Sequence, residues 1–260
     1  MNRRRLDVEL VRRRLAESRA EARRLISEGR VEVGAVAEPK PATLVSADQP
    51  VHVLRPPRYV GRGGEKLDAA LTAFEVPVTG RRAVDVGAST GGFTDRLLQG
   101  GADEVVAVDV GYGQLHWRLR RDERVRVVER TNIRYADPDA LGAPFDLVVA
   151  DLSFISIATV APALAALGHD DTDWVVLVKP QFELGRDQVG RGGVVRSAAL
   201  HVEAVHSAAE ALEAEGLGAR GVVAAPIRGA KGNQEYLLWA RRGPAHLGTE
   251  EIERIVEEGR

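Results

Sequence analysis

The chain has 260 residues, of which 44% are hydrophobic and 28% charged, enough for one Rossmann-sized domain and a small further unit. It contains no cysteine, which excludes disulfide bonds and thiolate metal sites. It has no apolar run of the ~18 residues that a membrane span needs, and its arginine-rich start does not resemble a secretory signal. We therefore expect a cytoplasmic protein with no bound metal and no membrane partner.

Charge is distributed unevenly along the chain. The formal net charge is −2, but residues 1–66 contain 15 Lys and Arg against 9 Asp and Glu, whereas residues 67–260 contain 21 against 29. A basic segment joined to an acidic body indicates either a polyanionic partner such as nucleic acid or an arginine-rich pair of solvated helices. Charge alone does not decide between the two.

Residues 1–54 are predicted to form a small α/β unit. Leu6 and Leu10 recur at helical spacing, Ser18 with Glu21 forms a capping box that opens a second helix, and Gly29 is placed to end it. Short alternating runs predict strands at 31–33, 43–45 and 51–53.

The polar faces of these two helices are rich in arginine. The arginines concerned are Arg12, Arg13, Arg19, Arg23 and Arg24. Because they lie opposite the apolar stripe, we expect them to be free to contact phosphate, together with Arg58 in the segment that follows.

Residues 55–63 are the expected linker, because two prolines and two glycines interrupt any regular pattern. From residue 64 to 243, strands alternate with helices, which is typical of an α/β fold with a mostly parallel sheet. We expect strands at 82–86, 104–109, 125–129, 145–150, 174–179, 219–224 and 234–240, and helices at 64–74, 92–99, 113–121, 155–167 and 197–215. Residues 244–260 are predicted to be an acidic tail with a helical pattern near its end.

A glycine-rich turn follows the first strand of this larger domain and opens a helix. It comprises Asp85, Gly87, Ser89, Thr90, Gly91, Gly92 and Phe93. Glycines let the backbone approach a ligand closely, and the helix start presents unpaired N–H groups. The turn matches neither the dinucleotide fingerprint nor the P-loop. Its acidic first residue favours S-adenosylmethionine as the cofactor, with a nicotinamide cofactor and a purely structural turn as alternatives.

Two further polar residues are candidates for holding a nucleoside. Asp109 ends the second strand, where a carboxylate can accept hydrogen bonds from ribose hydroxyls. Asn132 follows the third strand, where an adenine edge would lie or where Asn serves as a turn residue. Asp151 ends the fourth strand at the same edge of the sheet, so we include it in the cofactor site.

Four charged residues stand at element ends that a parallel sheet brings to one rim. Lys66 begins the first helix, Asp151 and Lys179 end the fourth and fifth strands, and Glu235 begins the last strand. Surface ion pairs are the simpler interpretation, but Lys179 directly follows the apolar run 175–178 in a strand that should be buried.

This set suits methylation of a ribose hydroxyl, which must lose its proton as it attacks a methyl group. A lysine becomes a base when a second cation and partial burial make its neutral amine accessible. We predict that Lys179 accepts the proton, that Asp151 and Lys66 position it, and that Glu235 holds the second lysine or the ribose.

Several long motifs resemble the TlyA, or haemolysin A, family. They are GGEKL (63–67), DVGASTGGFTDRLLQGGA (85–102), DLSFISI (151–157), LVKPQFELGRDQVGRGGVVR (177–196) and KGNQEY (231–236), and the similarity extends over about residues 3–241. The N-terminal stretch is similar to the RNA-binding module of ribosomal small-subunit protein four.

The resemblance implies a Rossmann-like, FtsJ-type methyltransferase domain with a seven-stranded sheet that uses S-adenosylmethionine. It implies 2′-O-methylation of cytidine in 23S and in some members 16S ribosomal RNA, and it matches a Lys-Asp-Lys-Glu tetrad to Lys66, Asp151, Lys179 and Glu235. Structured ribosomal RNA or ribosomal subunits are then the expected partners, and DNA is not.

Three other functions stay open at this point. A membrane-lytic protein would agree with the haemolysin name but has no apolar span to support it. A non-catalytic RNA-binding or assembly factor would not need the tetrad. A DNA or small-molecule methyltransferase on the same fold would not need the basic N-terminal segment.

Overall fold

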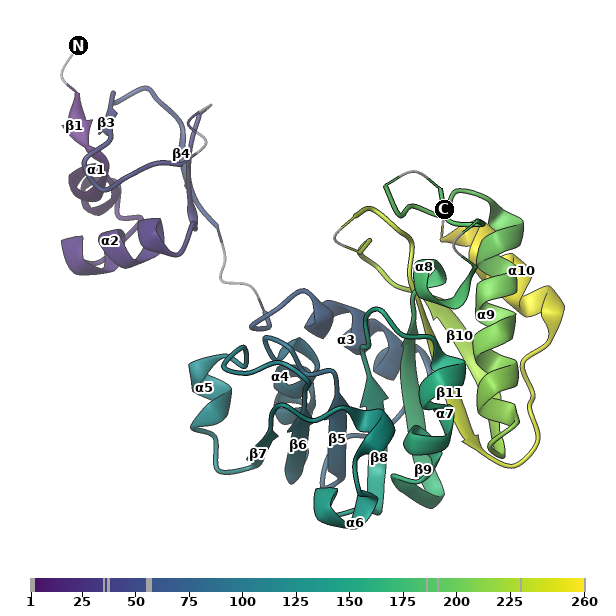
Figure 1. Ribbon diagram of the computed structural model, residues 1–260. Coiled ribbons are helices and arrows are strands. Elements are labelled where there is room, and N and C mark those ends of the chain that lie inside the picture. The colour runs from purple at the N-terminus through teal and green to yellow at the C-terminus, as the bar shows by residue number, and fades with distance from the viewer. Residues whose placement is uncertain are drawn as a thin grey trace. The chain divides into compact units, whose positions relative to one another are not determined.

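The computed structural model describes residues 3–34, 36, 38–54, 58–185, 187–190, 192–229 and 231–259 (Figure 1). The chain divides into two compact units, Met1–Pro57 and Arg58–Arg260. Of the expected linker, residues 55–57 lie outside the described residues. The rest belongs to the second unit, where Tyr59 is buried and the Val60 N–H donates to Asp95.

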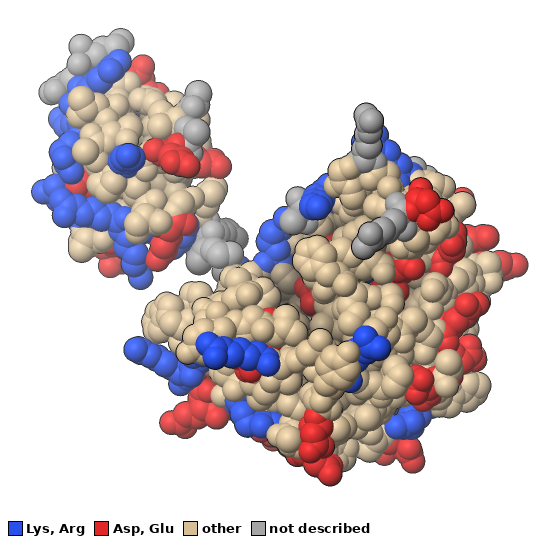
Figure 2. All heavy atoms as spheres, in the orientation of Figure 1, with Lys and Arg blue, Asp and Glu red and all other residues tan. Residues whose placement is uncertain are grey.

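The N-terminal unit packs two helices against short strands around its own apolar core. Its elements are β1 (Arg4–Arg5), α1 (Leu6–Arg12), α2 (Arg19–Ser27), β2 (Val31–Val33), β3 (Leu44–Val45) and β4 (Val51–Val53), with β1 antiparallel to β3 and β2 antiparallel to β4. Leu6, Leu10 and Val33 are fully buried in this core. Ser18 caps α2 by accepting from the Glu21 N–H, as predicted, and Gly29 follows the helix with φ +67°. On the face shown in Figure 2, Lys and Arg side chains lie along much of this unit.

The second unit is organised around one seven-stranded sheet in the order β10-β11-β9-β8-β5-β6-β7. The strands are β5 (Arg82–Val86), β6 (Glu104–Val108), β7 (Val125–Val128), β8 (Phe145–Ala150), β9 (Gly168–Val178), β10 (Leu217–Ala224) and β11 (Tyr236–Arg242). Neighbouring strands from β9 to β7 are parallel, and β11 is antiparallel to both β9 and β10. The mostly parallel α/β sheet of the prediction is therefore confirmed.

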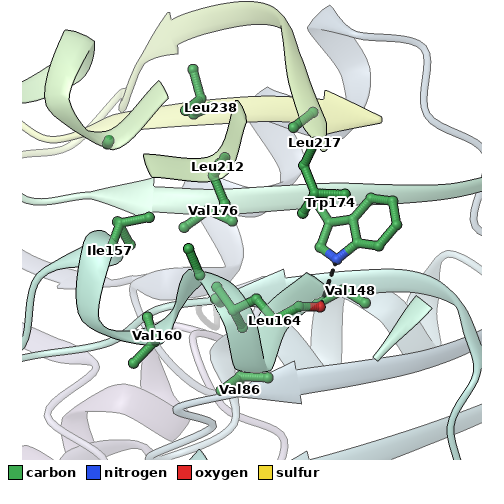
Figure 3. Close-up of a cluster of buried hydrophobic side chains, with 14 of the residues drawn as sticks. Val86, Val148, Ile157, Val160, Leu164, Trp174, Val176, Leu212, Leu217 and Leu238 are labelled. Atoms are coloured by element: carbon green, nitrogen blue, oxygen red, sulfur yellow. Dashed lines mark hydrogen bonds between the residues drawn. The ribbon is translucent and has the colours of Figure 1, made fainter. Parts of the chain in front are cut away.

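Helices cover both faces of the sheet, giving three layers (Figure 1). One face is covered by α3 (Gly63–Ala73), α4 (Gly92–Gln99) and α5 (Trp117–Arg120), and the other by α7 (Ile157–Ala165), α9 (Ala198–Glu213) and α10 (Thr249–Glu258). Short elements, η1 (Ile133–Tyr135), α6 (Pro138–Leu141) and α8 (Pro180–Glu183), connect the strands. Between the sheet and the second group of helices, the Trp174 indole N–H of β9 donates to the Leu164 carbonyl of α7 at 2.9 Å (Figure 3).

Most elements lie within two residues of their predicted bounds, and three regions differ more. β9 begins six residues before the predicted start, because Thr172 and Asp173 are buried polar residues that carry no apolar signal. α5 is shorter than predicted, because Gly113 takes φ +74° and His116 caps the helix by accepting from Arg118 N–H. The prediction of a separate acidic tail is wrong, because α10 buries Ile252 and Val256 in the core beside α9.

Within the described ranges, no helix combines the length and apolarity needed to cross a membrane.

Candidate active site

The four charged residues chosen from the sequence all stand at one edge of the sheet. Asp151 follows β8 and Lys179 follows β9, and these adjacent parallel strands end side by side. Glu235 precedes β11, which runs antiparallel to β9, so its first residue lies at the same edge. Lys66 lies in the first turn of α3.

Their side chains form two ion pairs, one for each lysine. Lys179 Nζ lies 2.6 Å from Asp151 Oδ1 and donates to Ser153 Oγ at 2.9 Å. Lys66 Nζ donates to Glu235 Oε2. Both lysines and Glu235 are buried, while Asp151 is half-buried. Because buried polar groups need partners, each lysine of this site is paired with one carboxylate.

A cavity of about 430 Å³ opens on the cofactor side of these pairs. The residues around it are Arg62, Gly63, Lys66, Gly87, Ala88, Ser89, Thr90, Gly92, Phe93, Asp151, Arg228 and Gly229. The glycine-rich turn therefore forms one wall, as expected of a loop that a nucleoside cofactor approaches. Gly87 takes φ +88°, and a Cβ there would lie 2.5 Å from the Asp151 carbonyl oxygen, so only glycine fits.

Four predicted cofactor residues do not line this cavity. Gly91 serves as the N-cap of α4 with φ +99°. The Asp109 carboxylate binds backbone groups, accepting from the Ser89 N–H at 2.7 Å and from the Gly111 N–H at 2.6 Å. Asn132 is exposed and caps η1 by accepting from Arg134 N–H, the turn role left open above.

Asp85, the fourth, is fully buried beneath the turn. Its Oδ2 accepts from the Thr94 N–H at 2.9 Å and the Thr94 hydroxyl at 2.6 Å, while its Oδ1 has no partner among the described residues. Burial raises the pKa of Asp85 to about 7, and the nearby charge of Asp151 adds to the effect. Asp85 therefore holds the first turn of α4 from beneath the glycine-rich turn and does not face the cavity.

A second cavity, of about 360 Å³, shares Lys66 and Gly229 with the first. Lys66, Lys179 and Glu235 line it together with Ser153, Phe154 and Phe182, among others. Lys66 therefore lines both cavities, whereas Asp151 lines the first and Lys179 and Glu235 line the second.

Sequence reasoning missed Phe154. Its ring is 88% exposed, its φ is +65°, and its centroid lies 5.1 Å from that of Phe182. An exposed ring at a cavity mouth is suited to stack on a nucleobase. The only signal in the sequence was a large apolar residue in the loop after Asp151.

Each of the predicted phosphate-binding arginines lies beside a carboxylate. Arg12 and Arg13 bind Glu9, Arg19 and Arg23 bind Asp7, Arg24 lies near Glu21 and Glu28, and Arg58 binds Asp68. Arg13 also donates to the carbonyls of Ser46, Ala47 and Gln49, so its guanidinium is used within the unit. The helix pattern placed these side chains on the polar face but gave no account of the carboxylates beside them.

Fold and site together define a Rossmann-like methyltransferase, and comparisons with known proteins agree. The family model of FtsJ-like methyltransferases matches residues 59–242, and that of the S4 domain matches residues 4–47. The chain is 50% identical to the 16S/23S rRNA (cytidine-2′-O)-methyltransferase TlyA of Mycobacterium tuberculosis, over 98% of each chain. It is 37% identical to Hemolysin A of Brachyspira hyodysenteriae, over 85% of this chain and 92% of that one.

A solved structure from Streptococcus thermophilus that carries a hemolysin name superposes with a TM-score of 0.76 at 38% identity, covering 100% of this chain and 96% of the other. The chain belongs to the TlyA family, with an S4 domain followed by an FtsJ-like methyltransferase domain. It is an S-adenosylmethionine-dependent enzyme.

Proposed function

We propose that the protein transfers a methyl group from S-adenosylmethionine to the 2′-hydroxyl of a cytidine in ribosomal RNA, with 23S RNA and also 16S RNA as substrates. The observation that carries the proposal is the pair of lysine–carboxylate contacts beside the two cavities. The cofactor supplies an electrophilic methyl group on a sulfonium. The chain's own residues must bring a sugar hydroxyl to it and remove the proton.

Lys179 is the proposed proton acceptor. Its amine reaches the second cavity and has Asp151 Oδ1 at 2.6 Å, so the ammonium formed when it takes the hydroxyl proton is stabilised at once. Lys66, held by Glu235, keeps a second positive charge beside the reacting oxygen. As the oxygen bonds to the methyl carbon, the carbon–sulfur bond breaks and S-adenosylhomocysteine is left.

The second unit also offers a surface suited to unpaired RNA. Exposed rings lie beside arginines at three places: Tyr112 with Arg130 at 4.2 Å, Trp117 with Arg121 at 5.4 Å, and Tyr135 with Arg134 at 5.4 Å. Rings that stack on bases and cations that meet phosphates are the two requirements of single-strand binding. A ribosomal substrate also implies a cytoplasmic enzyme.

The test is methylation of ribosomal RNA by the purified protein with a labelled cofactor. We expect incorporation at a cytidine, with the next phosphodiester made resistant to alkali, and no incorporation when that cytidine is replaced by 2′-deoxycytidine. Ribose-methylation maps of RNA from cells with and without the gene identify the position. Labelling of a base, or no labelling of either RNA, would refute the proposal.

A further inference from the structure

One carboxylate in the N-terminal unit gathers three arginines. Asp7 Oδ1 accepts from Arg5 Nε at 3.0 Å, and Asp7 Oδ2 accepts from Arg19 Nη2 at 3.0 Å and Arg23 Nε at 3.2 Å. The three guanidinium groups come from separate points of the chain, the residue before α1 and two turns of α2. They meet at this one carboxylate.

The burial of the partners is opposite. The Asp7 side chain is 0% exposed, whereas those of Arg5, Arg19 and Arg23 are 44%, 54% and 56% exposed. These guanidinium groups hold the pKa of Asp7 far below its usual range. One negative charge among three positive ones leaves the cluster with two units of uncompensated positive charge.

A structural ion pair needs only one arginine for one carboxylate. Arg19 and Arg23 each donate a single N–H to Asp7, and a guanidinium has five, so most of their donors still face solvent. Surface arginines normally lose side-chain entropy when they are ordered by a ligand. Here that ordering exists before any ligand arrives.

We propose that Asp7 is a positioning residue that fixes Arg5, Arg19 and Arg23 as a preformed binding site for RNA phosphates. The inference rests on the proposed function, because RNA supplies the phosphates. Charge-assisted N–H bonds from fixed guanidinium groups are the strongest form of phosphate recognition available to side chains.

A positioning role for Asp7 and simple electrostatics predict opposite changes in RNA affinity when the Asp7 charge is removed. Replacing Asp7 by Asn removes a negative charge from a surface that binds a polyanion, which by charge alone should tighten binding. If Asp7 acts by ordering the arginines, binding weakens instead. The matched control is Glu32→Gln, the same loss of charge at an exposed residue of β2 with no ion pair in the described part of the chain.

The experiment is a titration of the full-length protein against a fluorescent 23S ribosomal RNA fragment, with methylation of the same fragment by the wild-type protein measured alongside. We expect D7N to bind about three- to tenfold more weakly than wild type, E32Q to bind equally or more tightly, and both to retain wild-type cofactor affinity. D7N binding as tightly as E32Q would overturn the proposal. If wild type neither binds nor methylates the RNA, it is the proposed function that fails.

Loss of folding is checked separately by hydrogen exchange at the buried Leu6 and Leu10 amides. Asp7→Glu gives a second variant that keeps the charge and moves the carboxylate by one methylene. It should also weaken RNA binding while those amides stay protected, and full affinity in this variant would contradict the positioning role.

Discussion

Both units of the chain depend on contacts between basic and acidic side chains, but they bury different partners. In the catalytic unit both lysines of the tetrad and Glu235 are buried beside two cavities, and Asp151 is half-buried. In the N-terminal unit the carboxylates of Asp7 and Glu9 are buried, and the guanidinium groups around them are largely half-exposed. A lysine amine can act as a proton acceptor in a reaction, whereas arginine at a surface stays charged and presents several donors.

The acidic groups show the same division. The pKa of Glu9 is lowered to about 2, first by its hydrogen bond from Arg12, whereas burial without a cation raises the pKa of Asp85 to about 7. One unit is therefore built to hold fixed charge, and the other keeps groups that can change their protonation state near neutral pH.

The largest expected effect comes from exchanging lysine and arginine in the two units. Lys179→Arg keeps the charge but removes the proton acceptor, so methyl transfer should fall by about 10²- to 10⁴-fold. Cofactor affinity should stay near wild type.

Arg19→Lys keeps a charge at the RNA surface and should lower RNA affinity only a few-fold, because a single arginine contact is replaced by a weaker lysine contact. Single-turnover methylation measures the rate, calorimetry the cofactor affinity, and titration the RNA affinity. Near-normal turnover by K179R would show that Lys179 is not the proton acceptor.

Glycine replacements give the next largest contrast. Alanine at Gly87 would strain a φ of +88° and place its Cβ 2.5 Å from the Asp151 carbonyl oxygen. Because this displaces Asp151, both cofactor binding and turnover should fall more than about tenfold. Gly29 of the N-terminal unit also has positive φ, +67°, but a Cβ there meets nothing within 4 Å. Gly29→Ala should cost only about 1 kcal/mol in that unit's unfolding free energy and leave cofactor affinity unchanged. Equal loss of cofactor affinity in both variants would contradict the cradle.

Much of the catalytic unit follows from its sequence because parallel strands buried on both faces are continuous apolar runs. The bounds of β5 and β8 are as predicted for this reason, and the ends of the strands brought Asp151, Lys179 and Glu235 to one edge of the sheet, as expected. The first half of β9 carries polar residues, so its sequence pattern does not predict a strand. The structure shows the Thr172 hydroxyl donating to the Phe145 carbonyl there.

What periodicity does not give is the partner of a side chain. It placed Arg19 and Arg23 on a polar face, but their contacts with Asp7 span 12 and 16 residues. The position of Phe154 likewise depends on a positive φ that no propensity predicts for phenylalanine. The acidic composition of residues 249–258 concealed the apolar stripe of α10, because only Ile252, Ile255 and Val256 carry it.

A smaller contrast is expected in how salt affects RNA binding and cofactor binding. RNA affinity should fall steeply as salt rises, because phosphate contacts release counterions, whereas cofactor affinity should change little. Arg23→Ala removes one proposed phosphate contact and should make the slope of log affinity against log salt shallower by about one. Titrations from about 50 to 200 mM salt measure the slope. An unchanged slope in R23A would show that Arg23 does not meet a phosphate.

The smallest effect is the pH dependence of stability, and it should differ in direction between the units. Burial raises the pKa of Asp85 and of Glu183 to about 7, so the folded catalytic unit holds protons that the unfolded chain loses near pH 4. Their contribution to stability is therefore present at low pH and lost as pH rises through about 7. In the N-terminal unit the pKa values of Asp7 and Glu9 are lowered, so their contribution is present above about pH 4 and is lost only in strong acid.

Between about pH 5 and 8 the catalytic unit should thus melt at progressively lower temperature while the N-terminal unit does not change. Hydrogen exchange at the buried amides of each unit follows the two separately. Glu183 accepts from the Ile157 N–H at the start of α7, and Glu183→Gln keeps an acceptor there without the ionisation. The melting temperature of that variant should therefore depend less on pH. If both units lost stability in parallel, protonation of Asp85 and Glu183 would not be the source of the pH dependence.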